Sequence, residues 1–63
     1  MIDGYKKATI ELVDGMVNVY FDGQFVAQLV IYDYGDEFFV GLPDEERFFG
    51  RTIREAVGNW LLR

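Results

Sequence analysis

The sequence predicts an α+β fold: a small antiparallel four-stranded meander followed by one C-terminal helix packed on one face of the sheet. Two Asp-Gly dipeptides, at 14–15 and 22–23, each separate two apolar runs. Asp-Gly in this setting is a strong local signal for a β-hairpin, because both residues accept the positive φ of a two-residue turn. A capping sequence followed by apolar residues at helical spacing predicts the helix. With 63 residues, the chain has room for one domain, residues 1–63.

The first hairpin turns at Asp14-Gly15. A two-residue turn there pairs Leu12 with Val17 and Ile10 with Val19, which brings the apolar side chains of both strands onto one face. The alternation on either side of the turn is typical of strands with one buried face.

The third strand is the almost continuously apolar run 25–32, and two turns at Asp22-Gly23 are compatible with it. A plain two-residue turn places Gln28 opposite Val17, on the core face. A turn with a left-handed bulge at its glycine instead pairs Val17 with Ala27 and keeps Gln28 off that face. We favour the bulged turn for this reason.

A turn at 33–36 leads into a fourth strand, residues 37–42. Pro43 ends this strand, because proline has no N–H to donate to a neighbouring strand. Residues 44–50 are expected to form a loop with a charged start and an aromatic end.

The helix is expected to begin at Thr52. Thr52 and Glu55 have the spacing of a capping box, in which the threonine side chain and the glutamate side chain each bind a free backbone N–H. The apolar residues that follow recur at i, i+3, i+4, i+7 and i+8 and form one stripe: Ile53, Ala56, Val57, Trp60 and Leu61. Trp60 is therefore expected in the core.

A single helix covers only one face of a four-stranded sheet, so the other face needs a different cover. Several apolar side chains remain outside the predicted core: Val13, Met16, Tyr20, Val30, Tyr32 and Leu62. This much apolar surface on a short chain indicates a partner or a second copy. We expect a homodimer or a larger assembly, joined through the sheet face or an exposed strand.

The chain contains no cysteine and no histidine. Their absence excludes disulfides, zinc sites built from Cys and His, and a nucleophile–base pair that uses either residue. The remaining candidates for acid–base or metal chemistry are the carboxylates at 33–37 and 44–46, which we interpret as solvated turn residues. We therefore predict a protein that is not an enzyme and has no catalytic residues, no metal site and no cofactor.

The charge is distributed unevenly along the chain, whose net charge is −5. Residues 1–46 carry ten acids and two lysines, whereas residues 47–63 carry four arginines and one acid, Glu55. An acidic surface repels nucleic acid and favours a basic protein partner. Arg47, Arg51 and Arg54 are expected to pair with nearby acids or to contact a protein partner. No apolar run is long enough for a membrane span and no signal sequence is recognised, so no membrane is predicted and the cytoplasm is the default location.

The residues proposed for partner binding combine amphipathic aromatic side chains with acids on either side of the fourth strand. Tyrosine is enriched among the residues that dominate the binding energy of protein interfaces. Carboxylates beside such residues would steer a basic partner toward them. The candidate residues are Tyr20, Tyr32, Tyr34, Asp36, Glu37, Asp44, Glu45 and Glu46.

Segments 37–44 (EFFVGLPD) and 50–56 (GRTIREA) resemble the N-terminal domain of the HicB antitoxin family. That family has a strand ending in Pro-Asp, a loop, and a Gly-x-Thr-x-x-Glu-Ala motif that opens a helix; the matching residues here are Pro43, Asp44, Gly50, Thr52, Glu55 and Ala56. The resemblance covers residues 36–62. Three predicted strands precede it, where the family has a simpler hairpin.

The HicB resemblance implies a partial RNase H-like fold without catalytic residues that binds a small RNA-cleaving toxin. Operator binding is not implied, because no helix-turn-helix or ribbon-helix-helix segment follows Arg63. The leading hypothesis is therefore an antitoxin or similar inhibitor that captures a basic protein. The alternative is an acidic inhibitor, of the kind mobile elements encode, that mimics nucleic acid. A mimic needs carboxylates spread over an extended surface, whereas a toxin-binding domain needs an apolar patch with an acidic rim.

Overall fold

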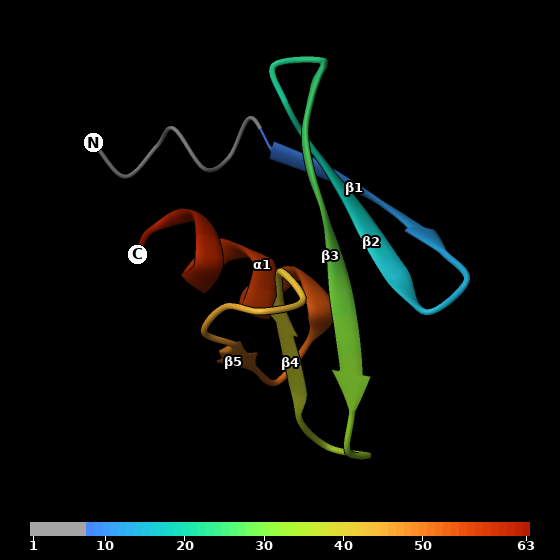
Figure 1. Ribbon diagram of the computed structural model, residues 1–63, viewed down its shortest axis with the longest axis vertical. Helices are drawn as coiled ribbons and strands as arrows, with labels where there is room; N and C mark the ends of the chain where they lie inside the picture. Colours follow the sequence, from blue (N-terminus) through green and yellow to red (C-terminus); the bar gives the residue numbers. More distant parts are fainter. Residues whose placement is uncertain (1–7) are drawn as a thin grey trace.

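The computed structural model describes residues 8–63 as an antiparallel sheet with one helix packed against it (Figure 1). The elements are β1 (Ala8–Val13), β2 (Met16–Phe21), β3 (Gln24–Asp33), β4 (Phe38–Gly41), β5 (Phe48–Gly50) and α1 (Ile53–Leu61). The strand order is β1-β2-β3-β4-β5, so each strand pairs with its neighbour in sequence. The predicted α+β class, the meander and the C-terminal helix are confirmed. The sheet has one strand more than predicted.

Both Asp-Gly turns have two residues with positive φ. The angles are 50° and 77° at Asp14-Gly15 and 56° and 83° at Asp22-Gly23. These are the signs that a type I′ turn requires, and its twist matches that of the flanking strands. The predicted register of the first hairpin is confirmed, with Leu12 opposite Val17.

The second hairpin contains its bulge inside β3 and not at the turn. Tyr20 lies opposite Phe25 and Val19 lies opposite Ala27, so Val26 is the extra residue. A bulge in the strand shifts the alternation of side chains just as a bulged turn would.

Because the bulge lies inside β3, the register of the second hairpin differs from the predicted one. Val17 lies opposite Leu29, so the predicted pairing of Val17 with Ala27 is wrong by two residues. The face predicted for Gln28 is nevertheless correct: Gln28 lies opposite Asn18 and its Nε2 donates to Asn18 Oδ1 over 2.9 Å.

The segment predicted as a loop, 44–50, contains β5. Phe39 lies opposite Phe49 and Val40 lies opposite Phe48, so the two Phe-Phe doublets of the sequence face each other across a hairpin. Because side chains alternate between faces, each doublet contributes one ring to the core face and one to the opposite face. β4 is correspondingly shorter than the predicted strand 37–42.

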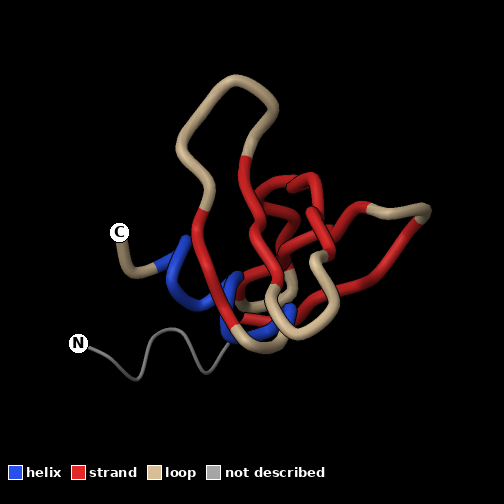
Figure 2. The backbone as a smooth tube through the Cα atoms, turned by 90° about the horizontal axis from the view of Figure 1, so that it is seen from below, coloured by secondary structure: helices blue, strands red, loops and turns tan. Residues whose placement is uncertain are grey.

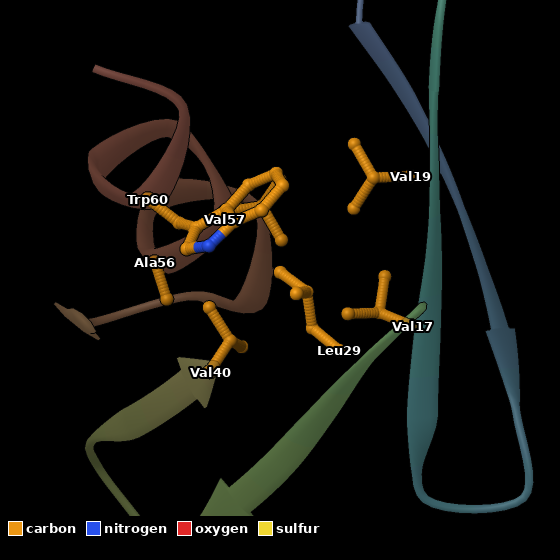
Figure 3. Packing of buried hydrophobic residues seen from close by; sticks show 7 residues of the cluster. All are labelled: Val17, Val19, Leu29, Val40, Ala56, Val57 and Trp60. Carbon is orange, nitrogen blue, oxygen red and sulfur yellow. The ribbon is translucent and has the colours of Figure 1, made fainter. Parts of the chain in front are cut away.

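The core lies between the sheet and α1 (Figure 3). Its fully packed members come from β2, β3, β4 and the helix: Val17, Val19, Leu29, Val40, Ala56, Val57 and Trp60. Trp60 is only 5 % exposed, which confirms that the stripe of the helix is core. Viewed from below, the helix lies at the lower left and partly overlaps the strands in projection (Figure 2). In residues 8–63 no helix is long and apolar enough to cross a membrane.

The start of the helix is held in two ways. The Thr52 side chain accepts a hydrogen bond from the Glu55 backbone N–H over 3.0 Å, as predicted for the N-cap. The Glu55 carboxylate accepts one from the backbone N–H of Arg51 over 2.7 Å. Gly50 brings the end of β5 against the helix, because a Cβ at this position would overlap the backbone of Ala56.

Trp60→Ala should lower the free energy of unfolding by about 3–5 kcal/mol, because it removes the largest side chain of a core that cannot refill the space. Thr52→Ala should cost about 1 kcal/mol, since only the cap is lost. Urea denaturation followed by circular dichroism measures both. Equal midpoints for Trp60→Ala and the parent would contradict this account of the core.

Candidate protein-binding surface

The face of the sheet opposite α1 is its outer face. Its members follow from the register and from the alternation of side chains along each strand. They include both polar and aromatic residues: Met16, Asn18, Tyr20, Phe25, Gln28, Val30, Tyr32, Phe39 and Phe49. In residues 8–63 no pocket is found. The outer face is the candidate site because it carries most of the tyrosines proposed for partner binding.

Four rings gather over β3, β4 and β5 and form what we call the aromatic cluster: Tyr32, Tyr34, Phe39 and Phe49. Tyr34 and Phe39 meet edge to face, with centroids 5.6 Å apart, and Phe39 lies 5.6 Å from Phe49. Tyr32 lies opposite Phe39 in the β3–β4 ladder. Tyr34 is 61 % exposed, so the cluster presents apolar surface to solvent.

The loop between β4 and β5 brings a cation onto this cluster. The guanidinium carbon of Arg47 lies 3.8 Å from the centroid of the Tyr32 ring, a cation–π contact. Gly41 makes the approach possible, because a Cβ at this position would lie 2.8 Å from the carbonyl oxygen of Glu46. The loop therefore packs directly against the end of β4.

Two exposed acidic segments, 33–37 and 44–46, lie at opposite ends of β4. The first is a turn in which the Asp33 carboxylate accepts from Gly35 N over 2.8 Å and Tyr34 N donates to the Glu37 carbonyl over 2.9 Å. The second follows Pro43, where Glu45 N donates to the Leu42 carbonyl over 3.1 Å. The aromatic cluster thus has carboxylates on both sides along the direction of β4.

Seven of the eight candidate binding residues belong to the aromatic cluster or to the two acidic segments at the ends of β4. Tyr32 and Tyr34 belong to the aromatic cluster. The acidic segments contain the other five: Asp36, Glu37, Asp44, Glu45 and Glu46. The eighth, Tyr20, lies apart, because its partner Phe25 is seven residues along β3 from Tyr32, roughly 20 Å at the rise of a strand. The assignment of these residues to partner binding stays a prediction.

Tyr20 belongs to a set of contacts between strands. Its hydroxyl donates to Glu11 Oε1 over 3.1 Å, and its ring meets that of Phe25 edge to face at 5.8 Å. Glu11 also accepts from Asn18 over 3.5 Å. These contacts explain Tyr20 as a cross-strand residue of β2, which is one of the two interpretations open from the sequence.

Sequence reasoning missed Phe39 and Phe49 as surface residues. The signal was present, because two Phe-Phe doublets ten residues apart predict a hairpin with one ring of each on the outer face. Arg47 and Arg54 were expected to pair with acids or to contact a partner. In the structure Arg47 stacks on Tyr32, and Arg54 donates to the carbonyl of Ala8 over 3.0 Å.

The comparisons with known proteins found no match to this chain among family models, curated proteins or solved structures. The resemblance to the HicB family therefore stays a prediction. In residues 8–63 no three carboxylates lie close enough together to hold a metal ion.

The hydrogen bond to Glu11 raises the pKa of the Tyr20 phenol above its ordinary value, because the bond requires the phenolic proton and the carboxylate disfavours a second negative charge. The hydrogen bond between Tyr20 and Glu11 stabilises the fold at pH values below the pKa that Tyr20 has in the unfolded chain. This stabilisation is lost as pH rises through the raised pKa of Tyr20 in the folded chain.

Glu11→Ala should lower the pKa of Tyr20, measured by NMR titration of its ring. Asp14→Asn removes the same charge without touching Tyr20. An equal shift in both variants would contradict the assigned cause.

Proposed function

We propose that the chain is a non-enzymatic protein-binding module that captures a basic protein partner, such as a small toxin ribonuclease, and thereby acts as an antitoxin or a similar inhibitor. The observation that carries the proposal is the exposed aromatic cluster between two acidic segments. The module works by binding alone. We place this activity in the cytoplasm, where an RNA-cleaving toxin meets its substrate.

In this proposal the aromatic rings supply binding energy and the carboxylates raise the rate of association. The rings of Tyr34 and Phe49 are accessible, and their burial against a partner would supply the apolar part of the binding energy. The carboxylates around them raise the rate of encounter with a positively charged surface and disfavour acidic competitors. Exposed aromatic groups surrounded by polar side chains are the usual composition of an interface centre and its rim.

This arrangement favours a protein-binding domain over a mimic of nucleic acid. A mimic needs negative charge spread along the surface it presents. Here the acids of segments 33–37 and 44–46 border an apolar patch. The outer face near Tyr20 also presents uncharged amides, those of Asn18 and Gln28, which hydrogen-bond to each other. The resemblance of segments 37–44 and 50–56 to the HicB family also supports a toxin as the partner.

Charge neutralisation beside the cluster tests the proposal. We expect Glu45→Gln combined with Glu46→Gln to slow association with an arginine-rich peptide and with the partner captured from the host. The association rate of the parent should fall as salt is added, because salt screens exposed charges. A biosensor with the immobilised peptide or partner measures the rate. Folding should be unaffected, since exposed charges contribute little to stability.

The matched control combines Asp14→Asn with Asp22→Asn, which removes the same two charges at the distant hairpin turns. Asparagine tolerates the positive φ of both sites. Equal slowing by both pairs of changes would mean that only net charge matters, which would contradict a site at the cluster. A variant with Tyr34→Ala should bind the captured partner more weakly, chiefly through faster dissociation.

Isolated DNA and RNA should bind negligibly at physiological salt, because the acidic surface repels phosphates. Fluorescence anisotropy with labelled oligonucleotides measures this. A tight, salt-sensitive complex with either would overturn the proposal and its alternative together. It would direct attention to Arg47, Arg51 and Arg54.

A further inference from the structure

The two edge strands of the sheet, β5 and β1, differ in how far other parts of the chain cover them. The β5 edge is short, and the side-chain amide of Asn59 in α1 donates to the carbonyl of Phe49 over 2.6 Å, so the helix covers this edge. The β1 edge is six residues long, and within residues 8–63 β1 pairs only with β2. Its first carbonyl, that of Ala8, accepts from Arg54.

The backbone groups that point outward from β1 can be identified from its hairpin. A two-residue turn is closed by the hydrogen-bonded pair Val13 and Met16, and hydrogen-bonded and non-hydrogen-bonded pairs then alternate along the strand. Leu12 and Ile10 belong to non-hydrogen-bonded pairs. Their N–H and C=O groups therefore face away from β2 and are ready to bind another strand.

Natural sheets protect such an edge with proline, lysine, a bulge or a short strand. β1 has the sequence ATIELV and pairs with β2 in regular register, so it has none of these devices. It also carries accessible apolar side chains, since Leu12 is 60 % exposed and Val13 is 37 % exposed. Leu12 lies on the core face but beyond the cover of the helix.

Electrostatics selects this edge among the possible contacts between two acidic copies. Six of the eleven acids lie in segments 33–37 and 44–46, so copies that met through that surface would repel each other. β1 contains a single charged residue, Glu11.

We propose that β1 is the homodimer interface: a second copy of this chain pairs its β1 antiparallel to the first and extends the sheet across the two-fold axis. This inference does not rest on the proposed function. It assigns the expected dimer to one edge and leaves the aromatic cluster, over β3 to β5, free in each copy.

The charge and the face of the side chains also select a register. A register centred on Glu11 would set two carboxylates directly opposite each other, which is unfavourable. A register centred on Ile10 sets Ile10 opposite Ile10 of the second copy and Glu11 opposite Thr9, and keeps the helices of both copies on one side. The outward groups of Ile10 then bind each other across the axis.

The test uses the full chain and two lysine substitutions. Light scattering at micromolar to millimolar concentration should report twice 7.3 kDa for the parent. Leu12→Lys should reduce the mass to 7.3 kDa, because it places a charge at the seam, as natural edge strands do. Leu62→Lys is the matched control: Leu62 is 52 % exposed at the end of α1, and this variant should keep the parent's mass.

Leu12→Pro is a second variant, since proline removes an N–H that only the dimer uses and is tolerated at an edge. Hydrogen exchange gives an independent readout in the parent: the amides of Ile10 and Leu12 should exchange slowly in the dimer and rapidly in Leu12→Lys. A parent mass of 7.3 kDa throughout, a dimer that persists in both Leu12 variants, or rapid exchange of both amides in a dimeric parent would overturn the proposal.

Discussion

The packing of α1 against the sheet is the interaction on which the rest of the molecule depends. A nine-residue helix cannot form stably alone in water, and a sheet of short strands needs a covered face. Each therefore supplies what the other lacks. Trp60 and Val57 fill the space above Val17 and Leu29 (Figure 3), and Gly50 lets the backbone of the helix approach β5.

This dependence leaves the outer face to be stabilised by its own side chains. Around Tyr20 the strands are joined by hydrogen bonds and an aromatic pair, which satisfy the polar groups locally. Around Phe39 the side-chain contacts between the strands are made by aromatic rings, and Arg47 stacks on Tyr32. Around Tyr20 the polar side chains bind one another. The cluster around Phe39 still exposes apolar surface, and for this reason we locate partner binding there.

Local signals in the sequence predicted the parts of the fold that depend on neighbouring residues. The Asp-Gly turns, the register of the first hairpin and the capped helix with Trp60 in the core are all of this kind. The bulge at Val26 was placed at the turn, because either position restores the apolar face, although the two registers differ by two residues. β5 was missed because a three-residue strand has no periodicity of its own, and the one signal for it, a Phe-Phe doublet that matches the doublet of β4, was not used. Because β5 was missed, Phe39 and Phe49 were not included in the candidate site.

The connectivity of the sheet has a kinetic consequence. Every strand pairs with the one next to it in the chain, and α1 follows β5 directly. Most contacts can therefore form by closing short loops, which costs little chain entropy and favours rapid folding. The hydrogen bond from Arg54 to Ala8 is different, because it spans 46 positions. It closes the molecule between its last element and its first strand, so it is expected to form late and to influence unfolding more than folding.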